Sequence, residues 1–114
     1  MGLTIHEAAE TTGWSPRMLR YLETVGLIEP PRNDAGYRIY GAEELQRLRT
    51  LRELLDRHGL GPSDVAFAKR MRDDAELEGA VARWLEEKAH KPDDVRASDW
   101  LEYEQRKHEK LLAA

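Results

Sequence analysis

The feature that most constrains this chain is a pair of short helix signals near its start, separated by a tight turn. Thr4 and Glu7 form a capping box, and Gly13 ends the amphipathic stretch that follows them. Ser15-Pro16 then begins a second helix, with the serine at the N-cap and the proline at the first helical position. Two short helices joined through a glycine are typical of a helix-turn-helix.

The segment after the second helix has a different character. Val25-Gly26-Leu27 ends that helix, and Pro30-Pro31 prevents a helix from forming directly after it. A cluster of turn residues at 33–36 precedes the alternating stretch Tyr37-Arg38-Ile39-Tyr40. The sequence therefore predicts a short β-hairpin over residues 28–40 with an exposed tip.

Helical patterns fill the rest of the chain. We expect helices at 42–58, after Gly61-Pro62, at about 75–90, and after Ser98, and these segments carry the apolar residues Leu45, Leu48, Leu51, Leu55, Val65, Phe67, Ala68, Met71, Leu77, Val81, Trp84 and Leu85. The predicted fold is mainly α with a small β-hairpin wing. It is a winged helix-turn-helix domain over residues 1–72, followed by two C-terminal helices over residues 73–114.

Composition and charge narrow the function classes. The 114 residues are enough for one domain with a short appendage, and the absence of cysteine excludes disulfides and thiolate metal sites within them. Apolar runs are too short to span a bilayer, and no signal-peptide core is evident, so we expect a cytoplasmic protein without a membrane partner. Basic and acidic side chains balance over residues 1–70, and the net charge of −4 lies entirely in the C-terminal third.

Two motifs become specific when they occur together. Arg20-Tyr21-Leu22-Glu23 with Gly26-Leu27-Ile28 is followed by Gly36-Tyr37-Arg38-Ile39-Tyr40. With these motifs, residues 3–72 resemble the DNA-binding domain of MerR-type transcriptional regulators. The resemblance implies a homodimer that binds promoter DNA, distorts it and acts on RNA polymerase.

The residue chemistry of the motifs also favours a DNA partner. Arg17 and Arg20 project from one face of the second helix, and arginine is suited to guanine edges and phosphates. Adjacent hairpin residues point to opposite sides, so we expect one of Tyr37 and Arg38 to pack inward and the other to meet phosphate. We interpret Glu23 as structural. The predicted DNA-binding residues are Ser15, Arg17, Arg20, Tyr21, Arg32, Tyr37 and Arg38, and Ser15 has the alternative role of a simple helix cap.

The C-terminal helices leave two arrangements open. In MerR-type proteins a helix after the DNA-binding domain pairs with its twin, and residues 75–90 occupy that place, so we expect a homodimer in which the last helix packs across the partner. The alternative is a monomer whose last helix folds back on its own domain. We expect Trp100, Tyr103, Lys107 and Leu111 to share one side of that helix, and Glu104 and His108 to lie at the solvated surface rather than hold a metal.

Several functions follow from this sequence. The first is a sequence-specific transcriptional regulator; the second is an architectural or excisionase-like recombination factor, which would bind direct repeats side by side. A protein-interaction module that uses the acidic C-terminal third is the third. We expect no enzyme and no cofactor, because the sequence lacks a phosphate loop, a nucleophile motif and a convergent carboxylate pair.

Overall fold

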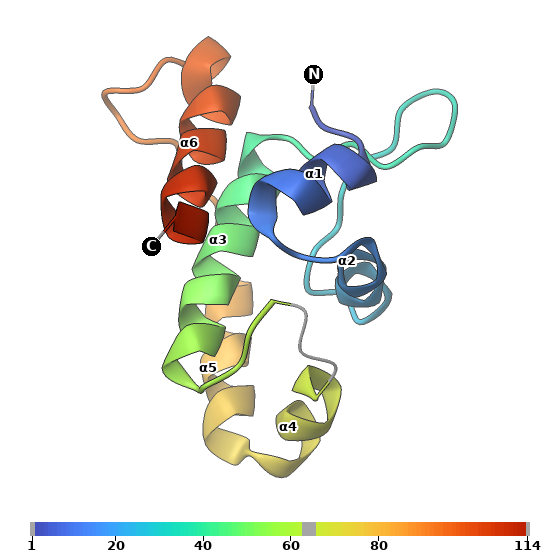
Figure 1. Cartoon of the computed structure of the whole chain (residues 1–114), viewed down its shortest axis with the longest axis vertical. Helices are drawn as coiled ribbons and strands as arrows, with labels where there is room; N and C mark the ends of the chain where they lie inside the picture. Colours follow the sequence, from blue (N-terminus) through green and yellow to red (C-terminus); the bar gives the residue numbers. More distant parts are fainter. Residues whose placement is uncertain (1, 63–65, 114) are drawn as a thin grey trace.

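Six α-helices and one 3-10 turn build the fold in residues 2–62 and 66–113, the part of the chain that the computed structural model describes (Figure 1). The helices are α1 (Ile5–Thr12), α2 (Pro16–Thr24), α3 (Ala42–Arg57), α4 (Phe67–Asp73), α5 (Ala75–Glu86) and α6 (Trp100–Ala113), and the 3-10 turn is η1 (Ala97–Asp99). No helix in this part of the chain is both long and apolar enough to cross a membrane.

The predicted caps of the first two helices are confirmed. The Thr4 backbone N–H donates to Glu7 Oε1 at 2.9 Å, and the Glu7 N–H donates to Thr4 Oγ1 at 3.2 Å. Gly13 ends α1 in the left-handed region at φ 79°, which favours glycine because it has no Cβ. Ser15 then caps α2 by accepting a hydrogen bond from the Met18 N–H at 3.1 Å. These local interactions set the turn between the two helices.

Helix α3 is the centre of the molecule, and α1, α5 and α6 all pack against it (Figure 1). Its predicted leucine face is confirmed, because Leu45, Leu48, Leu51 and Leu55 are fully buried. Trp14, from the turn between α1 and α2, is also buried and donates its indole N–H to the Leu48 carbonyl at 3.3 Å. The helix-turn-helix is therefore held against α3 by the residue that connects its two helices.

The predicted β-hairpin wing is wrong as secondary structure. Residues 28–40 form a loop, and no β-strand occurs in residues 2–62 or 66–113. Pairing across the loop is limited to an isolated antiparallel bridge between Arg32 and Arg38. A strand does not develop because Pro30 and Pro31 lack N–H donors and the turn occupies the residues from Asn33 to Tyr37.

Helices α4 and α5 differ in length from the prediction. Helix α4 begins at Phe67, and Val65, which we expected on it, lies outside the described residues. Asp74 caps α5 by accepting hydrogen bonds from the Glu76 and Leu77 N–H groups. Helix α5 ends at Glu86 instead of residue 90. The chain beyond it is drawn onto α3, where the Gln46 amide bonds both the N–H and the carbonyl of His90, at 2.7 and 2.6 Å.

The C-terminal helix contradicts the predicted faces. Helix α6 packs against α3 and α1 of its own chain, and its buried residues are Glu104 and His108. We expected these two side chains at the surface, and instead both are fully buried. Trp100, Tyr103, Lys107 and Leu111 are only partly buried. The expectation failed because the adjoining side of α3 supplies polar partners, which stabilise a buried charge on α6.

Helix α3 supplies hydrogen-bond partners for Glu104 and for one ring nitrogen of His108. Arg49 donates to Glu104 Oε1 at 3.1 and 3.2 Å, and Gln46 Nε2 and the Trp100 indole N–H donate to Oε2 at 3.3 and 3.1 Å. His108 Nε2 lies 2.7 Å from the Leu45 carbonyl and therefore acts as the donor. Burial lowers the pKa of the His108 imidazole and favours its neutral form. These bonds define the register of α6 on α3.

Replacing Glu104 tests this register. We expect Glu104→Ala to lower the free energy of unfolding by about 3 kcal/mol, because it leaves Arg49 facing a buried site without its carboxylate. The matched control is Glu102→Ala on the same helix, which removes an exposed ion pair with Arg106 and is expected to cost less than about 0.5 kcal/mol. Urea titration of the three proteins measures both values. Equal losses of unfolding free energy in the two variants would show that the Arg49–Glu104 pair does not fix the register of α6.

Candidate nucleic-acid interface

Helix α2 presents its basic residues to solvent because its other face is buried. Leu19 and Leu22 are at most 1% exposed and anchor the helix in the core. Arg17 and Arg20, three residues apart, are both exposed. In Figure 1, α6 lies on the opposite side of α3 from α2 and from the loop at 28–40. The C-terminal helix therefore leaves this face of the molecule uncovered.

The start of the chain holds the loop at 28–40 in place. Leu3 and Tyr40 exchange both of their backbone hydrogen bonds, each at 2.8 Å, in an isolated antiparallel bridge. Gly2 lies so close to this bridge that an added Cβ would fall 2.6 Å from Ile39 Cγ2 and 2.9 Å from the Tyr40 carbonyl oxygen. Tyr40 itself is fully buried. The bridge thereby brings the first turn of α1 next to the loop.

Glu23 of α2 anchors the loop from the other side. Its carboxylate accepts from Arg38 Nε at 2.5 Å and from Arg32 Nη2 at 3.2 Å, and the first of these contacts is partly buried. Arg32 also donates to the Gly36 carbonyl at 3.0 Å. These contacts agree with a structural role for Glu23. One carboxylate thus positions two arginines of the loop relative to the helix that carries Arg20.

Local hydrogen bonds shape the tip of the loop. Asn33 Oδ1 accepts from the Ala35 and Tyr37 N–H groups, both at 3.0 Å, and Gly36 occupies the left-handed region at φ 86°. Tyr37 follows this turn and is 70% exposed, whereas the Arg38 side chain is 26% exposed against Glu23. Of this pair, Tyr37 faces solvent and Arg38 turns inward.

These elements enclose one groove, which we call the arginine groove. It has a volume of about 530 Å³ and lies between the start of α1, α2 and the loop; its lining residues are Thr4, Ile5, His6, Arg20, Arg32, Gly36, Tyr37 and Arg38. Four of the predicted DNA-binding residues are therefore brought together on one surface. Three of them are arginines, and only two of those three pair with Glu23.

The other three predicted residues lie elsewhere on α2. Arg17 and Tyr21 line a small hollow of about 120 Å³ together with Met18 and Ala68 of α4. The Tyr21 ring meets the Phe67 ring edge to face, with centroids 6.3 Å apart. The Ser15 hydroxyl is used as the cap of α2. Tyr21 therefore connects α2 to α4 with Arg17 beside it, whereas Arg20 lines the groove together with the loop.

The sequence analysis missed Thr4, Ile5 and His6 as lining residues of the groove. Nothing in their local sequence marks them, because Thr4 reads as a helix cap and Ile5 as an apolar position. Only the bridge between Leu3 and Tyr40 places them beside Tyr37 and Arg38. The described residues contain no group of three or more histidine, aspartate or glutamate side chains arranged to hold a metal ion.

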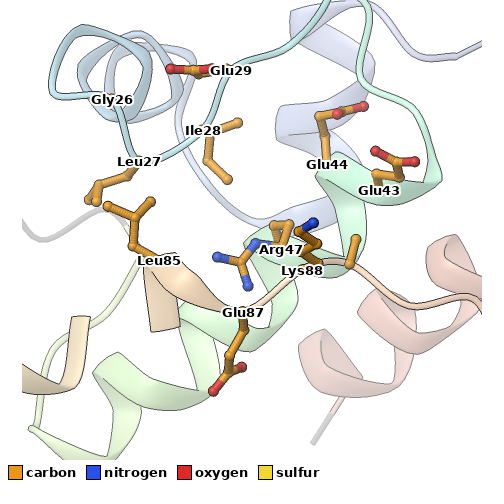
Figure 2. Close-up of a pocket in the computed structure, with 11 residues that line it drawn as sticks. Gly26, Leu27, Ile28, Glu29, Glu43, Glu44, Arg47, Leu85, Glu87 and Lys88 are labelled. Carbon is orange, nitrogen blue, oxygen red and sulfur yellow. The ribbon is translucent and has the colours of Figure 1, made fainter. Parts of the chain in front are cut away.

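A second hollow, of about 470 Å³, lies between the end of α2, the start of α3 and the end of α5 (Figure 2). Leu27 and Leu85 form an apolar wall, and Arg47 and Lys88 lie together near its middle. Arg47 donates to the Trp84 carbonyl at 2.6 Å and stacks on the Trp84 ring at 3.9 Å. This arginine therefore joins α3 to α5.

The role of Glu23 leads to a prediction about the loop. We expect Glu23→Ala to speed trypsin cleavage after Arg32 and Arg38 roughly fivefold, because the loop loses its charged anchor and opens more often. The control is Glu29→Ala, an exposed carboxylate at the edge of the second hollow. Timed digestion followed by mass spectrometry gives the rates. If both variants are cut as slowly as the parent protein, Glu23 does not hold the loop.

Curated relatives match somewhat less than half of the chain. Heavy metal-dependent transcription regulator 2 of Rhizobium meliloti (strain 1021) is 42% identical over 55 residues, which are 47% of this chain and 37% of that protein. HTH-type transcriptional regulator HmrR of Rhizobium leguminosarum bv. viciae is 43% identical over 49 residues, 43% of this chain and 38% of the relative. The chain thus spans about two fifths of the length of these relatives. No solved structure matches it at comparable significance.

A family model covers more of the chain. The model for MerR HTH family regulatory proteins matches residues 3–68, from the bridge residue Leu3 to Ala68 beside Arg17. These residues include the helix-turn-helix, the arginine groove and all of α3. The chain therefore belongs to the MerR HTH family of regulatory proteins.

Proposed function

We propose that this chain binds double-stranded DNA through the exposed face of α2 and the arginine groove, and acts as a MerR-type transcriptional regulator in the cytoplasm. The observation that carries the proposal is that Arg20 shares one groove with Arg32, Tyr37 and Arg38. The names of the matched relatives, which are transcriptional regulators, support the same function.

The chemistry of this surface suits a duplex. Arg17 and Arg20 lie on the exposed face of a short helix that can enter the major groove, where arginine donates two hydrogen bonds to a guanine edge. Tyr21 lies on the same helix and is assigned to the DNA with these arginines. Ser15 caps the start of this helix, and we assign its contribution to DNA binding to that position. We assign Arg32 and the exposed Tyr37 to the flanking phosphates, and Arg38, which turns inward to Glu23, lines the same groove and would meet a phosphate that enters it. Phosphate contacts supply most of the affinity and make it dependent on salt.

Two substitutions separate these roles. We expect Arg17→Ala and Arg38→Ala each to weaken DNA binding roughly tenfold while the helical circular dichroism is retained, because each removes one charged contact. Arg38→Ala is also expected to reduce the steepness of the plot of log binding constant against log salt concentration by about one, as the loss of a phosphate contact would. Gel-shift titrations over a salt series provide both numbers.

The control for this pair is Arg96→Ala. Arg96 is exposed and lies in the segment that joins α5 to α6, on the other side of α3 from α2 in Figure 1. Its removal should leave the affinity within about twofold. Unchanged affinity in both Arg17→Ala and Arg38→Ala would refute the assigned surface. Genomic footprints showing cooperative direct repeats, in place of one inverted repeat in a promoter, would support an architectural or recombination factor.

We further propose that the protein works as a homodimer, with residues 73–114 as its dimerisation and effector segment, and that it distorts promoter DNA to act on RNA polymerase. Family resemblance supports this proposal. In the chain, α5 buries Leu77, Val81 and Trp84 against its own core and leaves Leu85 47% exposed beside Leu27. A dimer contact would therefore centre on the exposed side of α5 around Leu85.

Sedimentation equilibrium tests the dimer. We expect a species near 26 kDa, twice the chain mass of 13.2 kDa, and a shift toward the monomer in Leu85→Asp, because a charge opposes burial at an interface. Tyr37→Asp, measured without DNA, serves as the control, since Tyr37 is exposed at 70% but lies in the loop, outside residues 73–114. A monomer at high protein concentration would exclude a stable dimer.

A further inference from the structure

His6 is placed in the arginine groove by the fold. It is an exposed residue in the first turn of α1, and it lines the groove with Arg20 of α2 and with Arg32, Tyr37 and Arg38 of the loop. The bridge between Leu3 and Tyr40 keeps the first turn of α1 against the loop. The imidazole of His6 therefore lies on the surface that we propose binds DNA.

Both basic and acidic side chains accompany His6, because three arginines line the groove with it and Glu7 and Glu10 share its helix. Arg20 faces it from α2, and Arg32 and Arg38 face it from the loop, although Glu23 pairs with both of these loop arginines. On its own helix, the neighbouring Glu7 carboxylate accepts the Thr4 N–H in the capping box. A phosphate that enters the groove brings negative charge next to His6 and attracts a positive charge on the imidazole.

We propose that His6 is a further DNA-contacting residue, which takes up a proton when the phosphate backbone enters the arginine groove and so makes DNA binding tighter as the pH falls. This inference rests on the proposed function, because it assigns a role within the same surface. The imidazolium donates a hydrogen bond to a phosphate oxygen, whereas the neutral ring contributes no charge. Since phosphates are common to all sequences, the effect is independent of the operator.

The direction in which DNA affinity changes with pH follows from proton linkage. If bound DNA stabilises the charged form of His6, the complex holds more protons than the free components near neutral pH, so lowering the pH strengthens binding. We expect an approximately fivefold gain in affinity between about pH 8 and about pH 6.

The test measures binding to a short duplex of mixed sequence by fluorescence anisotropy, at constant ionic strength and at these two pH values. The parent protein is expected to show the gain, and His6→Asn to change less than about twofold while matching the parent at the higher pH. His6→Arg is expected to bind the duplex tightly at both pH values. The matched control is His90→Asn, which removes an exposed histidine near Asp93 outside the groove and should keep the parental gain.

The outcomes distinguish a failure of the role proposed for His6 from a failure of the proposed DNA-binding function. If the parent protein binds the duplex and Arg38→Ala weakens binding, but His6→Asn keeps the full pH dependence, the role of His6 is refuted and the interface stands. If the parent protein does not bind the duplex at low salt at either pH, both proposals fail. Proton NMR of the His6 ring gives an independent readout, because its titration midpoint must move to higher pH on adding the duplex.

Discussion

The fold depends on the burial of the leucine face of α3. Leu45, Leu48, Leu51 and Leu55 are fully buried, and each contributes about 1.5–3 kcal/mol relative to an exposed side chain. Helices α1, α5 and α6 each cover part of this helix. Because Trp14 joins α1 to α2 and is hydrogen-bonded to the Leu48 carbonyl, the direction in which α2 projects is set from α3. The position of the basic surface follows from this packing.

The C-terminal part is attached to the same helix by polar contacts. Arg49 holds Glu104, the Leu45 carbonyl holds His108, and Gln46 holds the backbone of His90. Partly or fully buried polar groups are costly unless they are paired, so these contacts select one register for α6 among those that hydrophobic packing alone would allow. They also keep α6 on the side of α3 that is remote from α2 (Figure 1). The same packing that stabilises the chain thus leaves its basic face open.

Much of the helical architecture and part of the candidate site could be predicted from sequence. The caps at Thr4 and Ser15 and the leucine face of α3 are local or periodic signals, and the structure confirms them. Arg20, Tyr37 and Arg38 were predicted and share a groove, yet His6 was not, because its position depends on a backbone bridge between Leu3 and Tyr40. The predicted hairpin did not form because the alternating stretch at residues 37–40 is short and the segment opposite it contains two prolines.

The sequence by itself determined where α1, α2 and α3 begin and end, since capping and turn residues act over three or four positions, and it carried the motifs of the MerR family. Only the tertiary structure decided which side of α6 is buried. Glu104 and His108 resemble surface residues until Arg49 and the Leu45 carbonyl, 55 and 63 positions away, are placed against them. The free energy of a buried charge depends on its partners, and those partners are set by the packing of distant helices and not by neighbouring residues.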